Sequence, residues 1–177
     1  MSVPYPWINF ALFQLGWFAC VLGSAKGRPW TGPAFVAFAL AVHLRSPERR
    51  REAGLIACAA LGGTALDSVL VSAGIYRPAS GLLLPWLAPP WITALWFLFA
   101  TTLRHCLGWL AGRYTLAALF GFLGSPMSFL AAERLGALSL PADGRPMSLF
   151  TFAWTWALAM LGLLWLTGRL DVGNTKQ

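Results

Sequence analysis

The sequence has little charge. Asp, Glu, Lys and Arg make up 11% of its 177 residues, whereas 58% of the residues are hydrophobic. A soluble domain carries about 25% charged residues. The shortage argues against an ordinary soluble fold and predicts an integral membrane protein. The chain should form a single domain over residues 1–177, because six spans with short loops would use nearly all of it.

The sequence is equally poor in cysteine and in the motifs of familiar enzymes. Its three cysteines lie inside apolar runs and form no CxxC pair, which is typical of small buried hydrophobic residues. The HExxH, GxSxG and Walker patterns are absent. No Lys or Arg precedes the first apolar run, so we expect no cleaved signal peptide and a first span that stays in the mature protein.

A metal site would have to be built from scattered residues. The two histidines, His43 and His105, could bind zinc together with Asp67 and Glu133. Glu133 is expected at the surface opposite the histidines, which argues against this set. The sequence therefore predicts no bound metal and no cofactor.

Six apolar runs account for most of the chain. We expect helices rather than a barrel, because the runs do not alternate polar and apolar residues. The expected spans are 7–23, 31–44, 54–75, 90–111, 114–132 and 148–168. They predict an all-α fold, a polytopic bundle of six transmembrane helices. The apolar, proline-broken loop before residue 90 should lie in the outer interface, with Trp86 and Trp91 as aromatic anchors.

Positive charge is in excess, with a formal net charge of +7. Because no basic domain stands apart from the spans, these charges should set orientation and meet anionic lipid rather than bind nucleic acid. The loop 45–52 contains four arginines, and its side of the membrane carries seven Lys and Arg residues against five on the other. The positive-inside rule therefore predicts that both termini are cytoplasmic.

The span 90–111 is the one around which we expect the others to be organised. It carries Arg104 and His105 side by side before its apolar run has ended. At ~1.5 Å per residue they would lie about 6 Å past the bilayer midplane. Ionisable residues at that depth are costly and often mark function. Thr101 and Trp109 would lie one helical turn to either side of His105, on the same face.

Other polar residues share this depth if the chain crosses six times. Asn9, Gln14 and His43 fall in the same half of the bilayer, and Asp67 lies about 4 Å beyond the midplane. We expect these side chains to gather around one inner-half polar cavity. The candidate ligand-binding residues are Asn9, Gln14, His43, Asp67, Thr101, Arg104, His105 and Trp109.

Each candidate also has a structural alternative. Asp67 and Arg104 would form a buried ion pair, or Asp67 would serve a ligand or a proton path. His105 would donate a hydrogen bond to a nearby carbonyl group, or act as a general acid or base. Asn9 and Gln14 would join neighbouring helices through hydrogen bonds. The sequence alone leaves these alternatives open.

Several stretches resemble a known family. They are NFALFQLGWFACVLG, the surroundings of His43, the Gly63–Asp67 region, PPWITALWFLFATTLRHCLGWL and GSPMSFLAAERLGAL. Together they resemble the bacterial family of inner-membrane proteins known as domain of unknown function 2878. The resemblance covers most of the chain. It implies a multi-pass protein of the cytoplasmic membrane and an association with lipid modification, but no particular chemistry.

Three hypotheses of function follow. The first is a small membrane protein that binds or carries a lipidic or small organic molecule. The second is an intramembrane enzyme of lipid modification that uses His105 and Asp67 as acid and base groups. The third is a structural accessory subunit of a membrane complex. The expected partners are membrane lipids and a small-molecule or lipid ligand, with either a partner membrane protein or a second copy of the chain.

Overall fold

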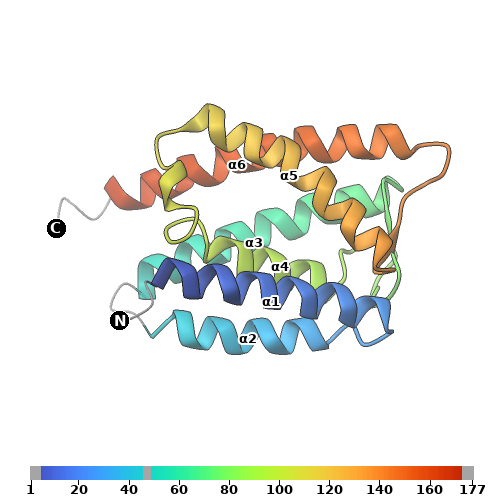
Figure 1. Ribbon diagram of the computed structural model, residues 1–177, viewed down its shortest axis with the longest axis horizontal. Helices are drawn as coiled ribbons and strands as arrows, with labels where there is room; N and C mark the ends of the chain where they lie inside the picture. The colour runs from blue at the N-terminus through green and yellow to red at the C-terminus, as the bar shows by residue number, and fades with distance from the viewer. Residues whose placement is uncertain (1–4, 46–48, 173–177) are drawn as a thin grey trace.

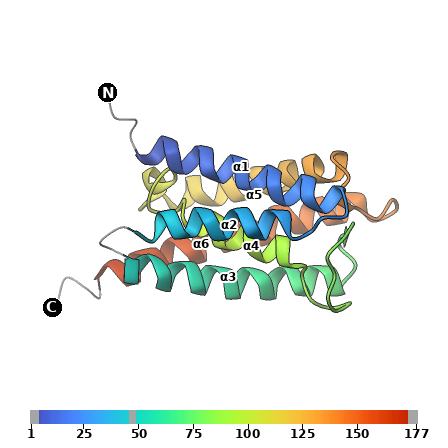
Figure 2. The same cartoon turned by 90° about the horizontal axis from the view of Figure 1, so that it is seen from below.

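The computed structural model describes residues 5–45 and 49–172 of the chain (Figures 1 and 2). Within these residues it is helical, with one pair of very short strands. The elements in chain order are α1 (Tyr5–Ala25), α2 (Thr31–His43), α3 (Arg49–Ser72), β1 (Arg77–Pro78), α4 (Pro90–Ala100), η1 (Gly108–Leu110), α5 (Tyr114–Arg134), β2 (Leu138–Ser139) and α6 (Arg145–Val172).

The six α-helices run back and forth between the two ends of the bundle (Figure 1). At one end, which we call the polar end, Tyr5 of α1 contacts His43 of α2, and His43 contacts Glu52 of α3. At the other end, which we call the strand end, β1 pairs antiparallel with β2. The strands thereby join the α3–α4 connection to the α5–α6 connection. The helix α1 begins, and α6 ends, at the polar end of the bundle.

Four helices in the described part of the chain are long and apolar enough to cross a membrane: Tyr5–Ala25, Glu52–Ser72, Tyr114–Arg134 and Arg145–Leu170. The other two are short. With 13 residues in α2 and 11 in α4, they extend only about 20 Å and 16 Å at ~1.5 Å per residue. The hydrocarbon core of a bilayer is ~30 Å thick. The all-α prediction is confirmed, and four of the six expected spans have the length of a membrane helix.

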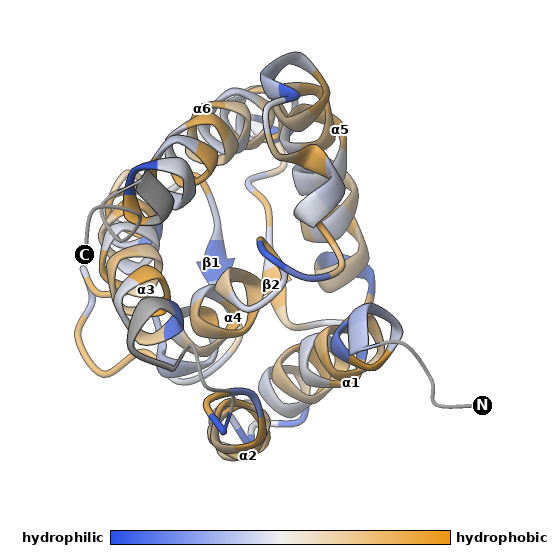
Figure 3. Cartoon of the chain, turned by 90° about the vertical axis from the view of Figure 1, so that its left-hand side faces the viewer, coloured by the Kyte–Doolittle hydropathy of each residue, from blue (hydrophilic) through white to orange (hydrophobic). Residues whose placement is uncertain are grey.

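The outer surface of the long helices is apolar. Large hydrophobic side chains on α3, α5 and α6 are 60% or more exposed, namely Leu61, Val69, Leu123, Met127 and Leu158. Figure 3 shows apolar residues on the outward sides of the helices as well as on the inward sides. A soluble monomer rarely exposes large apolar patches. These faces are therefore suited to contact with lipid acyl chains.

The short helix α4 lies inside the ring formed by the other helices and packs on α1, α2 and α3 (Figure 3). Most of its side chains are buried, among them Trp91 and Trp96. The prediction that Trp91 anchors the protein in the membrane interface is wrong. Trp91 is 1% exposed, and its indole Nε1 donates to the carbonyl oxygen of Ser80 at 3.2 Å. A tryptophan whose N–H has a partner is readily accommodated in a core.

The prediction of one continuous helix over 90–111 is also wrong, because α4 ends at Ala100. Beyond it, Thr101 and Thr102 donate their backbone N–H groups to carbonyl groups only three residues back. Their hydroxyl groups donate to the carbonyl groups of Leu98 and Phe99 at 2.7 Å and 2.6 Å. Side-chain hydroxyls of this kind compete with regular helical hydrogen bonds. The chain continues through turns to η1 and leads into α5.

This early helix end removes the basis for two expectations. Arg104 and His105 lie in the turns between α4 and η1, so helix rise does not give their depth. Thr101, His105 and Trp109 do not share a helical face for the same reason. The sequence 101–107 contains neither Gly nor Pro, so no residue in it marks the end of the helix.

A testable feature of the core is the close approach of α3 to α4. A Cβ atom at Gly63 would overlap the indole ring of Trp96. That ring stacks on Trp156 with a centroid distance of 4.5 Å and therefore has little freedom to move. We expect Gly63→Ala to lower the free energy of unfolding by about 1–3 kcal/mol, measured by denaturant unfolding in detergent.

The adjacent residue provides a matched control for this substitution. A Cβ atom at Gly62, on the same helix, has open space around it. Gly62→Ala should be neutral or should stabilise the protein by up to ~1 kcal/mol, because alanine favours helix. Equal effects of the two substitutions would contradict a tight contact between Gly63 and Trp96.

Candidate functional site

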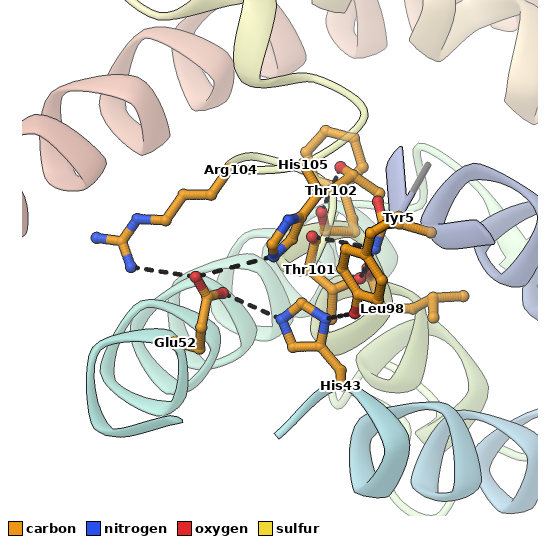
Figure 4. A network of polar contacts seen from close by, with 10 residues as sticks. Tyr5, His43, Glu52, Leu98, Thr101, Thr102, Arg104 and His105 are labelled. Atoms are coloured by element: carbon orange, nitrogen blue, oxygen red, sulfur yellow. Dashed lines mark hydrogen bonds and ion pairs between the residues drawn. The ribbon is translucent and has the colours of Figure 1, made fainter. Parts of the chain in front are cut away.

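Two groups of interacting polar side chains contain the candidate residues His43, Asp67, Arg104 and His105, and the first group lies at the polar end of the bundle (Figure 4). We call it the polar-end cluster; it consists of Tyr5, His43, Glu52, Arg104 and His105. Glu52 is 2% exposed and lies at its centre. One carboxylate oxygen, Oε2, is 3.1 Å from His43 Nε2. The other, Oε1, is 3.5 Å from Arg104 Nη1 and 4.0 Å from His105 Nε2.

Four parts of the chain bring these groups together, and Tyr5 comes from the start of α1. His43 occupies the last turn of α2 and Glu52 the first turn of α3, where the helix dipole favours a negative charge. Arg104 and His105 come from the turns after α4. A buried carboxylate is tolerated only with charge or hydrogen-bond partners. Glu52 contacts the side chains of Arg104 and His105 and so helps to hold the turns that follow α4.

The two histidine rings of the cluster lie close together. Their centroids are 5.0 Å apart at an interplanar angle of 83°. The Nδ1 atom of His43 forms a hydrogen bond of 2.8 Å with the hydroxyl group of Tyr5, so both of its ring nitrogens have partners. The Tyr5 ring also contacts His105 edge-on at 4.8 Å. Ligand-type atoms of His43, Glu52 and His105 lie within 4.8 Å of one another.

Glu52 is the residue that sequence reasoning missed. It was placed in the arginine-rich loop 45–52, although α3 already begins at Arg49. A signal was present in the spacing of the α3 residues. Ala59, Gly63 and Asp67 form one stripe on the helix, and Glu52 continues that stripe seven residues before Ala59. Extending the stripe would have placed a carboxylate on the buried face.

Asp67 belongs to the second group, deeper in the bundle. It is 2% exposed, and its Oδ1 accepts a hydrogen bond of 2.8 Å from the Tyr76 hydroxyl group. Its Oδ2 accepts a hydrogen bond of 2.6 Å from Trp96 Nε1. The Asp67–Arg104 ion pair considered from the sequence is wrong, because the structure pairs Arg104 with Glu52.

Tyr76 is held as a donor to Asp67 by its surroundings. It is fully buried and lies in the connection between α3 and β1. Burial, and then the neighbouring carboxylate, raise the pKa of Tyr76 well above its ordinary value. The phenol therefore stays protonated at physiological pH and donates its hydrogen to Asp67.

Asp67 also contributes to the wall of a cavity of about 460 Å³ between α1, α4, α5 and α6. The wall is largely aromatic and apolar and includes Phe13, Trp17, Phe99 and Met160. Cavities of this size and character are typical of sites for small molecules. Gln14 lies in the same wall. The cavity is thus apolar with a few polar groups.

Two polar atoms of this cavity wall need a partner. Ser125 and Trp156 line the cavity, and their Oγ and Nε1 atoms are buried without a hydrogen-bond partner among the described residues. More than 90% of buried polar groups in proteins are hydrogen-bonded. Two residues of the cavity wall thus carry a buried polar atom without a hydrogen-bond partner in the described part of the chain.

The single polar cavity expected from the sequence is therefore wrong. Gln14 and Asp67 line the apolar cavity, whereas His43, Arg104 and His105 belong to the polar-end cluster. The remaining candidates belong to neither set. Asn9 Nδ2 donates to the carbonyl and hydroxyl oxygens of Thr101, both at 3.2 Å, and so joins α1 to the end of α4. Trp109 lies in η1 and is 52% exposed.

The fold and these sites define a class: an all-helical protein with membrane-type helices, an apolar internal cavity and a buried polar cluster at one end. The chain belongs to the family described as Protein of unknown function (DUF2878), whose family model matches residues 6–162. The family resemblance inferred from the sequence is thus confirmed. No curated protein and no solved structure matches the chain.

Proposed function

We propose that this protein is a multi-pass inner-membrane protein that binds or carries a lipid-like molecule in the cavity between α1, α4, α5 and α6. The observation that supports this most directly is an apolar cavity of about 460 Å³ with two wall residues that each carry a buried polar atom without a partner among the described residues. Hydrocarbon would fill the apolar part of the cavity. A single uncharged polar group of the ligand would bind the two atoms.

The entrance to the cavity supports a ligand that arrives from the membrane. Several wall residues are also strongly exposed: Phe10 and Phe18 on α1 at 47% and 46%, and Phe120 and Met127 on α5 at 42% and 69%. The cavity therefore opens sideways between α1 and α5, on a face suited to acyl chains. A hydrogen bond of 3.1 Å from Trp17 Nε1 to Ser128 Oγ crosses this opening.

The polar atoms favour a particular kind of head group. Trp156 Nε1 can only donate, and the Ser125 hydroxyl can donate or accept. A carbonyl or ester oxygen would satisfy both. A charged phosphate group would be poorly matched, because neither Lys nor Arg is among the described residues of the cavity wall. The chemistry of the wall thus supports a neutral lipid or a small ester.

We further propose that all six helices cross the membrane and that the polar end faces the cytoplasm. The alternating course of the helices supports six crossings, with α2 and α4 completed by their flanking segments. The cytoplasmic assignment rests on the four arginines among residues 45–52, between the end of α2 and the first turn of α3. An enzyme that uses His105 with Asp67 is less well supported, because the two residues belong to separate groups.

A cavity-filling substitution tests the proposed ligand site. A Cβ atom at Gly124 in the cavity wall meets no atom within 4 Å, so Gly124→Leu should fold while its side chain fills part of the cavity. We expect native mass spectrometry of the wild-type protein to show a bound lipid. Occupancy should fall at least tenfold in Gly124→Leu, because the leucine takes the volume that the ligand needs.

Gly162 provides the matched control. It lies on α6, is not part of the cavity wall and also has open space around it. Gly162→Leu should keep the wild-type occupancy. A wild-type protein that carries no lipid, or equal occupancy in the two variants, would overturn the proposed site.

A further inference from the structure

We propose that the polar-end cluster binds a divalent transition-metal ion such as Zn²⁺ through His43 Nε2, His105 Nε2 and one carboxylate oxygen of Glu52. Imidazole nitrogen and carboxylate oxygen are the ligands that zinc most often takes besides thiolate. The ligand-type atoms of these residues lie within 4.8 Å of one another. Neither His43 nor Glu52 belongs to the wall of the apolar cavity, so this inference does not depend on the proposed lipid site.

The distances within the cluster suit a tetrahedral ion. With metal–ligand bonds of about 2.0–2.1 Å, two ligand atoms of a tetrahedral site lie roughly 3.3 Å apart. His43 Nε2 is 3.1 Å from Glu52 Oε2. His105 Nε2 is 4.0 Å from Glu52 Oε1 and lies within 4.8 Å of the ligand atoms of the other two residues, so it would have to move toward them to complete the set. The side chain of His105 is 26% exposed and extends from a turn rather than from a helix.

The surrounding groups orient the ligands as in known metal sites. A histidine that binds a metal usually donates its other ring N–H to an oxygen. The hydroxyl oxygen of Tyr5, 2.8 Å from His43 Nδ1, is in the right place to accept that hydrogen. Arg104 Nη1 is nearest to Glu52 Oε1, while Oε2 faces His43. Glu52 can therefore bind an ion through Oε2 and keep its contact with Arg104 through Oε1.

Three protein ligands leave at least one coordination position free. Structural zinc sites are usually closed by four protein ligands, whereas catalytic sites keep an open position for water or substrate. Two histidines and one carboxylate also form the set that holds non-haem iron in oxygenases. The geometry thus points to an ion that can take a further small ligand. The positive charge of Arg104 close to Glu52 should weaken the binding of any cation.

Calorimetric titration of the purified full-length protein with ZnCl₂ in detergent tests the proposal. We expect one ion per chain and an affinity at least tenfold lower in His105→Ala, which removes a partly exposed ligand. Arg104→Gln should bind zinc more tightly than the wild type. Cys58→Ser is the matched control, because Cys58 is an exposed thiol outside the cluster that could bind zinc adventitiously. This variant should keep the wild-type affinity.

A second measurement covers the case in which His105→Ala fails to fold. Co²⁺ bound to the wild-type protein in place of zinc should give the visible d–d absorption of a tetrahedral nitrogen–oxygen site, without the thiolate charge-transfer band of a cysteine ligand. The proposal is overturned if the wild type binds no zinc or if Co²⁺ gives no such spectrum. It is equally overturned if His105→Ala folds and keeps the wild-type affinity, or if binding is lost in Cys58→Ser.

Discussion

Asp67→Ala should lower the free energy of unfolding by about 2–6 kcal/mol, because it removes the acceptor of two buried donors at about 1–3 kcal/mol each. The Tyr76 hydroxyl and Trp96 Nε1 donate to the two carboxylate oxygens at 2.8 Å and 2.6 Å. Tyr76 is completely buried and Trp96 is 3% exposed. Thermal and denaturant unfolding in detergent, followed by tryptophan fluorescence, measures the loss.

Two further variants separate the hydrogen bonds from simple loss of packing. Asp67→Asn keeps one acceptor oxygen and should lose less stability than Asp67→Ala, since only one donor is left without a partner. Tyr76→Phe removes one donor, so the Asp67→Ala/Tyr76→Phe variant should be more stable than the sum of the single effects indicates, by about 0.5–3 kcal/mol. Strictly additive effects, or an Asp67→Ala protein as stable as the wild type, would contradict this role of Asp67.

The sequence predicted the long helices well because their signal is local. Apolar runs predicted helices at 7–23, 114–132 and 148–168. The observed helices α1, α5 and α6 contain these ranges and are two to four residues longer at five of their six ends. An uninterrupted apolar run in lipid forms a helix, because a helix satisfies all the backbone hydrogen-bonding groups within the run. The end of α4 was not predictable in this way. It depends on threonine hydroxyl groups, on Asn9 from α1 and on Glu52 from α3.

The candidate site was predicted in its residue types but not in its pairing. The presence of ionisable residues inside apolar runs correctly singled out Asp67 and the Arg104–His105 pair as unusual. It gave no information on partners contributed by loops. Tyr76, which donates to Asp67, follows a turn at Gly74 with φ of +70°, a conformation that favours glycine. Glu52 directly follows three arginines in the sequence. For this reason the sequence indicated Asp67, and not Glu52, as the carboxylate that could pair with Arg104.

Glu52→Gln should be among the most destabilising single substitutions in the protein, with a loss of about 3–5 kcal/mol, because it removes a buried carboxylate that pairs with Arg104 and contacts His43. Arg104 Nη1 lies 3.5 Å from Glu52, and their side chains are 11% and 3% exposed. The substitution also removes the negative charge near the N-terminus of α3, which adds about 0.3–1 kcal/mol. Unfolding should be measured with EDTA present, so that bound metal does not contribute to the free energy.

A double-mutant cycle identifies the partner of Arg104. Glu52→Gln and Arg104→Met together should cost less than the sum of the two single substitutions, with a coupling of about 1–3 kcal/mol, as expected for residues in one ion-pair network. The matched cycle pairs Arg104→Met with Asp67→Asn. It should be additive within ~0.5 kcal/mol, the usual result for residues without shared partners. Coupling of Arg104 to Asp67 and not to Glu52 would restore the ion pair first considered from the sequence. It would also mean that the turns after α4 are held by something other than the polar-end cluster.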